Sequence, residues 1–367
     1  MPNKRFDQRL KGLPPEILNK IARIDELKGQ WIAGAKLSPQ VLGRLKHSVL
    51  ITSTGASTRI EGARLSDAEV EKLMSGISLQ KFSNRDKQEV KGYFELLRNV
   101  FNAWEHIRFS ESTVKHFHKE VLKYVEKDEG HRGEYKKKEN KVTMIDAAGK
   151  PVGVLFDTTP AYLTPKEILE LVEWTQNALK EKRYHPLLII GNFIVEFLNI
   201  HPFEDGNGRL SRILINLLLL KEGYLYMPYV SHEKMIEDNK PEYYLALRKS
   251  QKTFRPACLS ADRQDRTGRG KHENLAAWLE FFLAVFLRQS KTAVDLLSAE
   301  NIEKLLSPKQ LLVWQYLQSV DEATPLELSN KTGILRPTIN QALDRLLSFK
   351  KIERIGLGRG TRYRKLG

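Results

Sequence analysis

Apolar residues recur three or four positions apart through much of the N-terminal hundred residues, a spacing that places them on one face of a helix. The first such stripe lies within residues 16–27 and follows a Pro-Pro pair, which suits a helix start. A second helix is expected after Ser38-Pro39, and further helices are predicted over 90–104 and 112–125. The pattern therefore indicates a mainly helical N-terminal region.

Two later stretches are apolar on nearly every side. Residues 187–199 and 210–220 consist almost entirely of aliphatic and aromatic side chains, so both are predicted to be buried core helices. The polar segment between them, residues 201–209, is then held at both ends by packed helices. A site on such a segment keeps a fixed geometry.

Residues 133–160 follow a different pattern. Short apolar runs lie on either side of Ala148-Gly149-Lys150-Pro151, which has the composition of a tight turn. We predict a small β-hairpin here, with residues 152–156 in its second strand.

The C-terminal residues 305–367 show a third pattern. Three helices are predicted to open near Pro308, Pro325 and Pro337, and strand-like alternation over 352–364 surrounds a glycine-rich turn. Three helices followed by a hairpin resemble a winged helix-turn-helix domain.

This C-terminal segment is also basic, with eleven Lys or Arg residues against five Asp or Glu residues. We expect it to bind DNA, with its third helix in the major groove. The candidate contacts are polar residues of that helix and arginines of the wing: Thr338, Asn340, Gln341, Arg359 and Arg362. The alternative is a winged helix that serves protein contacts or dimerisation.

Composition narrows the class of protein. The 367 residues suffice for two or three domains, and 41% hydrophobic with 29% charged residues is typical of a soluble globular protein. A single cysteine, Cys258, excludes an internal disulfide and fits a reducing, cytoplasmic setting. The N-terminus does not read as a secretory signal, and the longest apolar run, 213–220, is too short to span a membrane.

The net charge of +15, with a pI of about 9.6, favours an acidic partner, and nucleic acid is the first candidate. A generally lysine-rich soluble protein would have the same balance. Composition does not choose between the two.

One short segment concentrates groups suited to chemistry: residues 201–212 read HPFEDGNGRLSR. His201 can accept a proton near neutral pH. Asp205 offers the carboxylate oxygens that Mg²⁺ prefers. The segment thus supplies one base candidate and one metal ligand.

The rest of the segment suits an anion. Gly206-Asn207-Gly208 lets backbone N–H groups approach a phosphate closely, because glycine has no Cβ. Arg209 and Arg212 are three residues apart, so they share a helix face, where two forked cations suit a polyphosphate. Together these groups predict a nucleotide site for phosphoryl-type transfer.

The segment resembles the signature of Fic-domain enzymes, His-x-Phe-x-(Asp/Glu)-Gly-Asn-Gly-Arg-x-x-Arg, and every specified position is present. The resemblance implies a helical fold that takes ATP and transfers its AMP moiety to a Ser, Thr or Tyr hydroxyl of a protein. It implies that His201 deprotonates this hydroxyl and that Asp205 binds the Mg²⁺ bridging the α- and β-phosphates. It also assigns the anion hole to Gly206, Asn207 and Gly208, and the distal phosphates to Arg209 and Arg212.

A second motif lies upstream, where residues 57–62 read STRIEG. It matches the pattern (Ser/Thr)-x-x-x-Glu-(Gly/Asn), which in one large class of Fic proteins is inhibitory. The matching residues are Ser57, Glu61 and Gly62, and the resemblance pairs Glu61 with Arg212. The alternative is that Glu61 only caps or solvates a helix end.

The resemblance also implies a wall for the adenine and a dock for the target. The adenine pocket would include Tyr243 and Tyr244, and Gln251 stands where the family commonly has Asn. The hairpin would be a flap that takes the target backbone as an added strand. Its edge consists of Val152, Gly153, Val154, Leu155 and Phe156.

These patterns predict a mainly α protein with a Fic-type helical core, a β-hairpin flap and a C-terminal winged helix. The expected segments are a helical region with the inhibitory motif, a Fic core, a linker with a helix, and the winged helix: 1–110, 111–255, 256–304 and 305–367. The expected activity is AMP transfer from ATP, with Mg²⁺, to target proteins and to the chain itself. Alternatives are AMP removal, transfer of another nucleotide moiety, or a nucleotide-sensing DNA-binding regulator, and a homodimer is left open.

Overall fold

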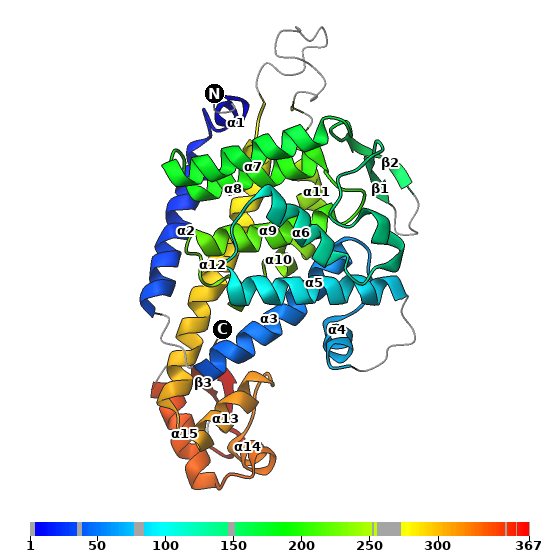
Figure 1. Cartoon of the computed structure of the whole chain (residues 1–367). Helices are drawn as coiled ribbons and strands as arrows, with labels where there is room; N and C mark the ends of the chain where they lie inside the picture. Colours follow the sequence, from blue (N-terminus) through cyan, green and yellow to red (C-terminus); the bar gives the residue numbers. More distant parts are fainter. Residues whose placement is uncertain are drawn as a thin grey trace. The chain divides into compact units, whose positions relative to one another are not determined.

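The computed structural model describes residues 4–34, 39–76, 84–145, 151–251, 253–254, 273–348, 351–356 and 358–366. At some of these positions, including both strands of the first hairpin, only the backbone is described. The chain forms two compact units, Met1–Ala293 and Val294–Gly367 (Figure 1).

The first unit is mainly helical, as the sequence predicts. Its N-terminal helices are α1 (Lys4–Arg9), α2 (Pro15–Gly34), α3 (Pro39–Ile60), α4 (Asp67–Met74), α5 (Asn84–Ala103) and α6 (Glu111–Val121). The short 3₁₀ helix η1 (Glu126–His131) and strands β1 (Lys141–Ile145) and β2 (Pro151–Asp157) follow. The remaining elements are α7 (Thr164–Glu181), α8 (Pro186–Ile200), α9 (Asn207–Lys221), η2 (Met227–Tyr229), α10 (His232–Glu237), α11 (Lys240–Gln251) and α12 (Ala276–Leu305), which continues into the second unit.

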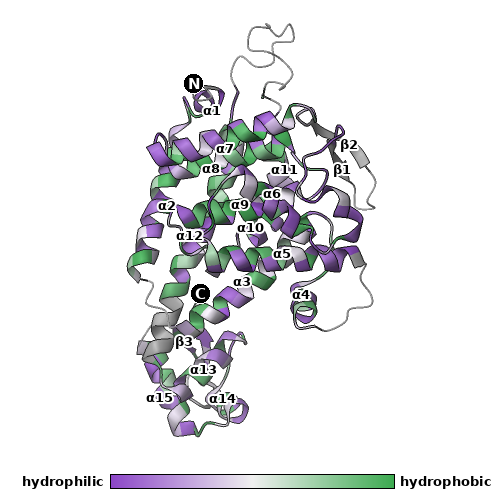
Figure 2. Cartoon of the chain, in the orientation of Figure 1, coloured by the Kyte–Doolittle hydropathy of each residue, from purple (hydrophilic) through white to green (hydrophobic). Residues whose placement is uncertain are grey.

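Helices α8 and α9 form the core of this unit. Nearly every side chain on both is buried, because their sequences are apolar all round, and Figure 2 shows hydrophobic residues along them. Helix α8 packs against α7 and α9, and α9 also contacts α3, α5 and α6. The loop between α8 and α9 is therefore fixed at both ends by the core.

Helix α3 brings the upstream motif to this core. It packs against α5, α9 and α10, and it ends at Ile60. Gly62 follows with a φ of +107°, a backbone conformation that glycine adopts without strain. The turn is closed by hydrogen bonds from the Gly62 N–H to the Arg59 carbonyl (3.1 Å) and from the Ala63 N–H to the Thr58 carbonyl (3.0 Å). The motif is thus the last turn of a packed helix.

The predicted hairpin is present. Strands β1 and β2 pair antiparallel, with Val142 opposite Phe156 and Ile145 opposite Pro151, and the register shifts twice between these pairs. The predicted turn at 148–151 falls mostly on residues 146–150, which lie outside the described residues. Helix α11 lies against β2, so the strand predicted as a flap borders the same core.

The second unit has the order of elements that the sequence predicts. Its helices are α13 (Pro308–Gln318), α14 (Pro325–Thr332) and α15 (Arg336–Ser348), followed by β3 (Ile352–Ile355), η3 (Gly358–Gly360) and β4 (Arg362–Lys365). Strands β3 and β4 pair antiparallel. All three helices and both strands contribute to one core, including Trp314, Leu328, Leu343, Ile352 and Tyr363.

Two boundaries differ from expectation. The division between the compact units falls after Ala293, within α12, whereas the sequence places the last domain from residue 305. Helix α9 begins at Asn207 rather than at Leu210. Among the helices described, none has the length and apolar character needed to cross a membrane.

Candidate functional site

At both ends of the loop from His201 to Gly206, a residue adopts the left-handed backbone conformation. His201 ends α8 with a φ of +51°, and its N–H donates to the Phe197 carbonyl (2.9 Å). Gly206 precedes α9 with a φ of +79°. Inside the loop, the buried Asn207 amide accepts from the Phe203 N–H (3.0 Å) and donates to the Phe203 carbonyl (2.8 Å). These bonds satisfy buried backbone groups, and they fix the loop.

His201 is held in a neutral form. Burial lowers its pKa to about 4, and the charge of Lys136 acts in the same direction. Its Nδ1 lies 3.4 Å from the Leu198 carbonyl. With the ring proton on Nδ1, Nε2 keeps its lone pair, so the imidazole is a proton acceptor at neutral pH.

Lys136 and Asn140 brace this loop from outside it, and the sequence offered no signal for either. The Lys136 ammonium donates to the Ile200 carbonyl (3.0 Å) and to Thr158 Oγ1 (2.8 Å). The Asn140 amide donates to the Phe203 carbonyl (3.0 Å). Burial lowers the pKa of Lys136 to about 8. An ordinary lysine in a charged run thus serves as a buried donor.

His118 supports the same loop from α6. Its ring stacks on Phe203 at a centroid distance of 3.8 Å. Its Nδ1 accepts from the Gly133 N–H (2.9 Å), so its Nε2 carries the proton and donates to the Asp205 carbonyl (3.0 Å). Burial lowers the pKa of His118 to about 4. A histidine on an apolar helix face gave no sequence signal for this role.

Asp205, the predicted metal ligand, lies at the edge of the loop with 40% of its side chain exposed. Oδ1 accepts from the Gly206 N–H (2.6 Å), and Oδ2 accepts from Arg85 (2.7 Å) and Arg209 (3.0 Å). Burial opposes its ionisation, but Arg209, the Gly206 N–H and Arg85 together hold its pKa below the ordinary value. The carboxylate is therefore ionised at neutral pH.

The residues present fit a Mg²⁺ ion that takes most of its ligands from a bound nucleotide and only one from the protein. Among the residues described, no three His, Cys, Asp or Glu side chains gather into a metal cage. Mg²⁺ commonly takes only one or two carboxylates and fills its remaining positions with phosphate oxygens and water. A single ionised, partly exposed carboxylate beside an anion site meets that need.

The first turn of α9 has the backbone geometry of an anion site. Its first intrahelical bond runs from the Leu210 N–H to the Gly206 carbonyl (2.9 Å), so the three preceding N–H groups have no partner within the helix. A helix N-terminus with such groups favours an anion. The sequence predicts residues 201–209 as the segment between two helices, whereas Asn207, Gly208 and Arg209 belong to α9 itself.

The carboxylate of Glu61 lies at this helix terminus. A Cβ on Gly208 would lie 2.1 Å from Glu61 Oε1, so only glycine allows this approach. The same oxygen accepts a hydrogen bond from Arg212 Nη2 (2.8 Å). Glu61 therefore lies against the first turn of α9 and against one of the two predicted phosphate-binding arginines.

Arg212 is buried, and most of its guanidinium donors have hydrogen-bond partners. Its Nε donates to Ser57 Oγ (2.7 Å) and its Nη2 to the Ser57 carbonyl (2.9 Å). Burial is the largest influence and opposes its charge, but Glu61, Tyr243 and Tyr93 together raise the pKa of Arg212 above the ordinary value. Within the described part of the chain, Arg212 Nη1 is buried with no hydrogen-bond partner, although it lies beside Gly208. One donor of this arginine is thus available to a ligand.

Arg209 is equally buried and also occupied by carboxylates. Its Nη1 lies 2.9 Å from Glu89 Oε2, and its Nη2 lies 3.0 Å from Asp205 Oδ2. Glu89 in turn accepts from Arg85 Nε (2.8 Å). Sequence reasoning found neither Arg85 nor Glu89, because an Arg-Glu pair four apart on a helix is typical of a solvated face.

The predicted adenine residues lie on α11. Tyr243 is buried and Tyr244 half-buried, and burial raises the pKa of Tyr243 to about 12 against the opposing charge of Arg212. Gln251 is also buried, and neither atom of its amide has a hydrogen-bond partner among the described residues. Such an unpaired amide is costly unless a ligand completes it.

The remaining predicted contacts are placed only in part. For residues 152–156 of β2 the backbone alone is described, and the side chain of Arg359 lies outside the description. In the second unit, Asn340 and Gln341 are exposed on α15, whereas Thr338 is half-buried. Arg362 is exposed but donates to Glu322 (2.6 Å).

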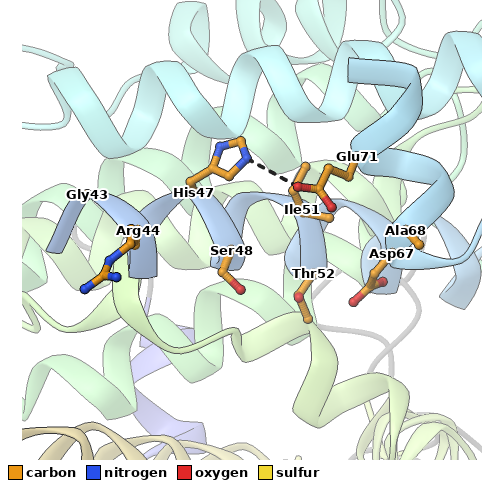
Figure 3. A pocket seen from close by; sticks show the side chains of 9 residues that line it. All are labelled: Gly43, Arg44, His47, Ser48, Ile51, Thr52, Asp67, Ala68 and Glu71. Carbon is orange, nitrogen blue, oxygen red and sulfur yellow. Dashed lines mark ion pairs between the residues drawn. The ribbon is translucent and has the colours of Figure 1, made fainter. Parts of the chain in front are cut away.

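A cavity elsewhere in the first unit is not formed by these residues. It has a volume of about 650 Å³ and lies between α3 and α4 (Figure 3). Its lining consists of Gly43, Arg44, His47, Ser48, Ile51, Thr52, Asp67, Ala68 and Glu71. No residue of the 201–212 segment lines it, so this cavity is separate from the candidate site.

Comparisons with known proteins give a fold, and a family for part of the chain. Residues 108–219 match the Fic/DOC family. Over 84 residues the chain is 38% identical to a probable protein adenylyltransferase, aq_aa38, of Aquifex aeolicus (strain VF5), covering 23% of this chain and 25% of that protein. It is 24% identical over 211 residues to the protein adenylyltransferase Fic of Aedes aegypti, covering 56% of this chain and 39% of the relative. The chain thus spans well under half of these curated relatives.

The fold has a match over nearly the whole chain. A crystal structure of a Fic family protein from Desulfovibrio desulfuricans G20 aligns with a TM-score of 0.61 at 24% identity, covering 98% of each chain. At that identity the likeness concerns the fold alone. The family match and the intact 201–212 segment identify residues 108–219 as a Fic domain of the Fic/DOC family.

Proposed function

We propose that this protein is an adenylyltransferase that moves AMP from ATP to a Ser, Thr or Tyr hydroxyl of target proteins and of itself. The proposal depends on one observation: a neutral histidine, a partly exposed carboxylate and two buried arginines lie around the N-terminus of α9. They are His201, Asp205, Arg209 and Arg212. Relatives named protein adenylyltransferases support this choice of reaction.

In the proposed reaction, the hydroxyl oxygen attacks the α-phosphorus, and the bond from that phosphorus to its bridging oxygen breaks. Pyrophosphate leaves and AMP becomes esterified to the side chain. His201 takes the hydroxyl proton, which requires the neutral imidazole that burial maintains at physiological pH. The N–H groups of Asn207 and Gly208 would stabilise the phosphate charge at the helix terminus.

Arg209 and Arg212 would hold the distal phosphates, and Asp205 would hold Mg²⁺. A bound Mg²⁺ would neutralise phosphate charge and orient the triphosphate. The unpaired Gln251 amide, with Tyr243 and Tyr244, would form the adenine pocket. Strand β2 would dock the target through backbone hydrogen bonds.

We further propose that Glu61 inhibits this activity. Its carboxylate rests where the helix terminus favours an anion, and it engages the Arg212 guanidinium at 2.8 Å. A γ-phosphate would need the same guanidinium. ATP would then bind with its α-phosphate displaced, and a displacement of about 1 Å can cost roughly 10²-fold in rate.

The test uses ATP labelled at the α- or the γ-phosphate. Retained α-label with loss of γ-label marks AMP transfer, and Glu61→Gly should raise it above a weak wild-type level. His201→Ala in the Glu61→Gly background should lower it by about 10²–10⁴-fold while ATP binding persists. Transfer that survives His201→Ala would refute the assignment of the base.

The same assay separates the rival reactions. Release of AMP from a pre-labelled target would indicate removal rather than transfer. A preference for another labelled nucleotide would show that this nucleotide, and not ATP, is the donor of the transferred group. No transfer of any label, together with tight sequence-specific DNA binding, would favour a nucleotide-sensing regulator.

A second candidate function is DNA binding by the C-terminal unit, which we propose to act as a winged helix. Three helices and a hairpin, with Asn340 and Gln341 exposed on the third helix and a surplus of basic residues, support it. Asp344 is also exposed one turn later, so a phosphate cannot approach that part of α15 without repulsion.

The proposed DNA contacts are testable in the full chain. Binding to a labelled duplex pool should weaken steeply with salt, as release of counterions requires. Asn340→Ala with Gln341→Ala should reduce selection among sequences more than it reduces total binding. If neither changes, α15 does not read bases, and protein contacts or dimerisation become the better explanation.

A further inference from the structure

The carboxylate proposed to hold Mg²⁺ is part of a ring of four alternating charges. The ring consists of Arg85, Asp205, Arg209 and Glu89, and every neighbouring pair is joined at 2.7–3.0 Å. Arg209 and Glu89 form its buried half, with side-chain exposures of 2% and 9%. Arg85 and Asp205 form its open half, at 44% and 40%.

Arg85 comes from outside the signature loop and occupies the oxygen that a metal would use. It stands in the first turn of α5, and its Nη2 lies 2.7 Å from Asp205 Oδ2. Since Oδ1 already accepts from the Gly206 N–H, both oxygens of Asp205 have partners. Arg209 Nη2 shares Oδ2 from the buried side at 3.0 Å, so Arg85 covers the side of this oxygen that faces solvent. A divalent cation that approaches from solvent is repelled by the Arg85 guanidinium.

We propose that Arg85 is a positioning residue that blocks access of metal to Asp205 until nucleotide binds. Resting on the proposed function, this inference concerns how the site is loaded. Arg85 would leave the carboxylate when triphosphate oxygens accept its hydrogen bonds, and Asp205 could then hold Mg²⁺ on the solvent-facing side of Oδ2, beside Arg209. Metal alone therefore binds weakly, and metal with nucleotide binds well.

The charges give the direction of the effect. With Arg85 in place the ring is neutral, since two guanidinium groups face two carboxylates. Without Arg85 it carries one net negative charge beside a helix terminus, which favours a cation at Asp205. Arg85 also lies 3.8 Å from Asp128, so its loss leaves a second carboxylate facing the site.

The size of the effect follows from exposure. Ion pairs that are partly open to water are weak, so the presence of Arg85 at Asp205 is expected to lower the metal affinity of the wild type by only roughly 2- to 5-fold. Arg85→Gln should tighten Mn²⁺ binding by that factor in the absence of nucleotide. Arg85→Lys keeps the charge and should stay close to the wild type.

The experiment measures free Mn²⁺ by electron paramagnetic resonance during titration of the full chain. Each titration is done without nucleotide, and then with an ATP analogue whose α,β-bridging oxygen is replaced by a methylene group. Arg98→Gln is the matched control, because Arg98 is exposed on the same helix and lies about 20 Å along it from Arg85. Arg98→Gln should leave both dissociation constants unchanged.

The expected result is tighter Mn²⁺ binding by Arg85→Gln without nucleotide, together with a smaller gain when the analogue is added. Unchanged or weaker Mn²⁺ binding without nucleotide would overturn the inference. Asp205→Ala identifies a different failure, since unchanged Mn²⁺ binding in that variant would remove Asp205 as the ligand. The α-label assay tests AMP transfer separately from both.

Discussion

Replacing Gly55 with alanine should loosen the proposed inhibition without touching either member of the Glu61–Arg212 pair. Gly55 lies within α3, and the Arg59 guanidinium fills the space that a side chain at position 55 would take. A Cβ at this position would lie 2.5 Å from Arg59 Nη1 and 2.6 Å from Asp67 Oδ1. Normal contact distances require both groups to retreat by about 1 Å.

The displaced guanidinium anchors the turn that carries Glu61. Arg59 Nη1 donates to the Leu65 carbonyl (2.8 Å), just beyond that turn, and its other nitrogens pair with Glu237 (2.5 Å) and Asp67 (2.9 Å). Burial opposes the charge of Arg59, but Glu237 and Asp67 raise its pKa above the ordinary value. The anchor is therefore charged at every physiological pH.

The expected magnitudes are modest and opposed. Alanine stabilises a helix interior by about 1 kcal/mol over glycine. Loss of a partly exposed ion pair costs about 0.2–1 kcal/mol. The free energy of unfolding should thus change by less than about 1 kcal/mol. A turn released by up to about 1 kcal/mol should raise AMP transfer by about 2- to 5-fold.

The assay compares α-label incorporation by wild type, Gly55→Ala and Glu61→Gly at equal protein concentration. Gly43→Ala is the control, because Gly43 lies on the same helix and a Cβ there would have nothing within 4 Å. Activation by Glu61→Gly without any by Gly55→Ala would show that Arg59 does not hold the inhibitory turn. Equal activity of Gly43→Ala and Gly55→Ala would show the same.

The remaining predictions concern the loop and the buried histidines. Asp205→Ala should lower AMP transfer and remove its response to a Mg²⁺ titration; an unchanged response would exclude the ligand role. Asn207→Ala should lower the free energy of unfolding by about 1–3 kcal/mol, measured in urea, because both backbone groups of Phe203 lose a buried partner. His118 and His232 have pKa values lowered by burial to about 4 and about 3, so the stability they contribute is complete above pH 6.5 and is lost as the pH falls toward 4. Each should cost up to about 2 kcal/mol between pH 7 and pH 5, and His232→Phe should flatten this dependence in unfolding measured at both pH values.

The sequence brings the candidate site residues together where they are contiguous. The 201–212 segment places a base, a carboxylate and two arginines within one loop and one helix turn, so local geometry brings them together. Its two apolar flanks predict the buried helices α8 and α9 because a run that is apolar on every side has no exposed face.

The same reasoning fails where the contacts are distant in sequence. Arg85 lies 120 residues from Asp205, and nothing in a helical Arg-Glu pair distinguishes a solvated face from a ring of charges. His118 gave no signal for the same reason. The apolar run predicts the start of α9 at residue 210, three residues late, because the helix begins on polar residues and the Asn207 side chain bonds the Phe203 backbone at that start.

The opposing charges at the site suggest why ATP and metal would load together. Glu61 faces Arg212, and the neutral ring of Arg85, Asp205, Arg209 and Glu89 adds no net charge, so this whole group of six is neutral. Removing Glu61 leaves one positive charge, which should strengthen binding of metal-free ATP. Removing Arg85 leaves one negative charge, which should strengthen binding of the metal. Metal-bound ATP would supply both an anion for the arginines and a cation for Asp205, so it would offset the charges of these groups together, whereas ATP or metal alone would offset only one kind.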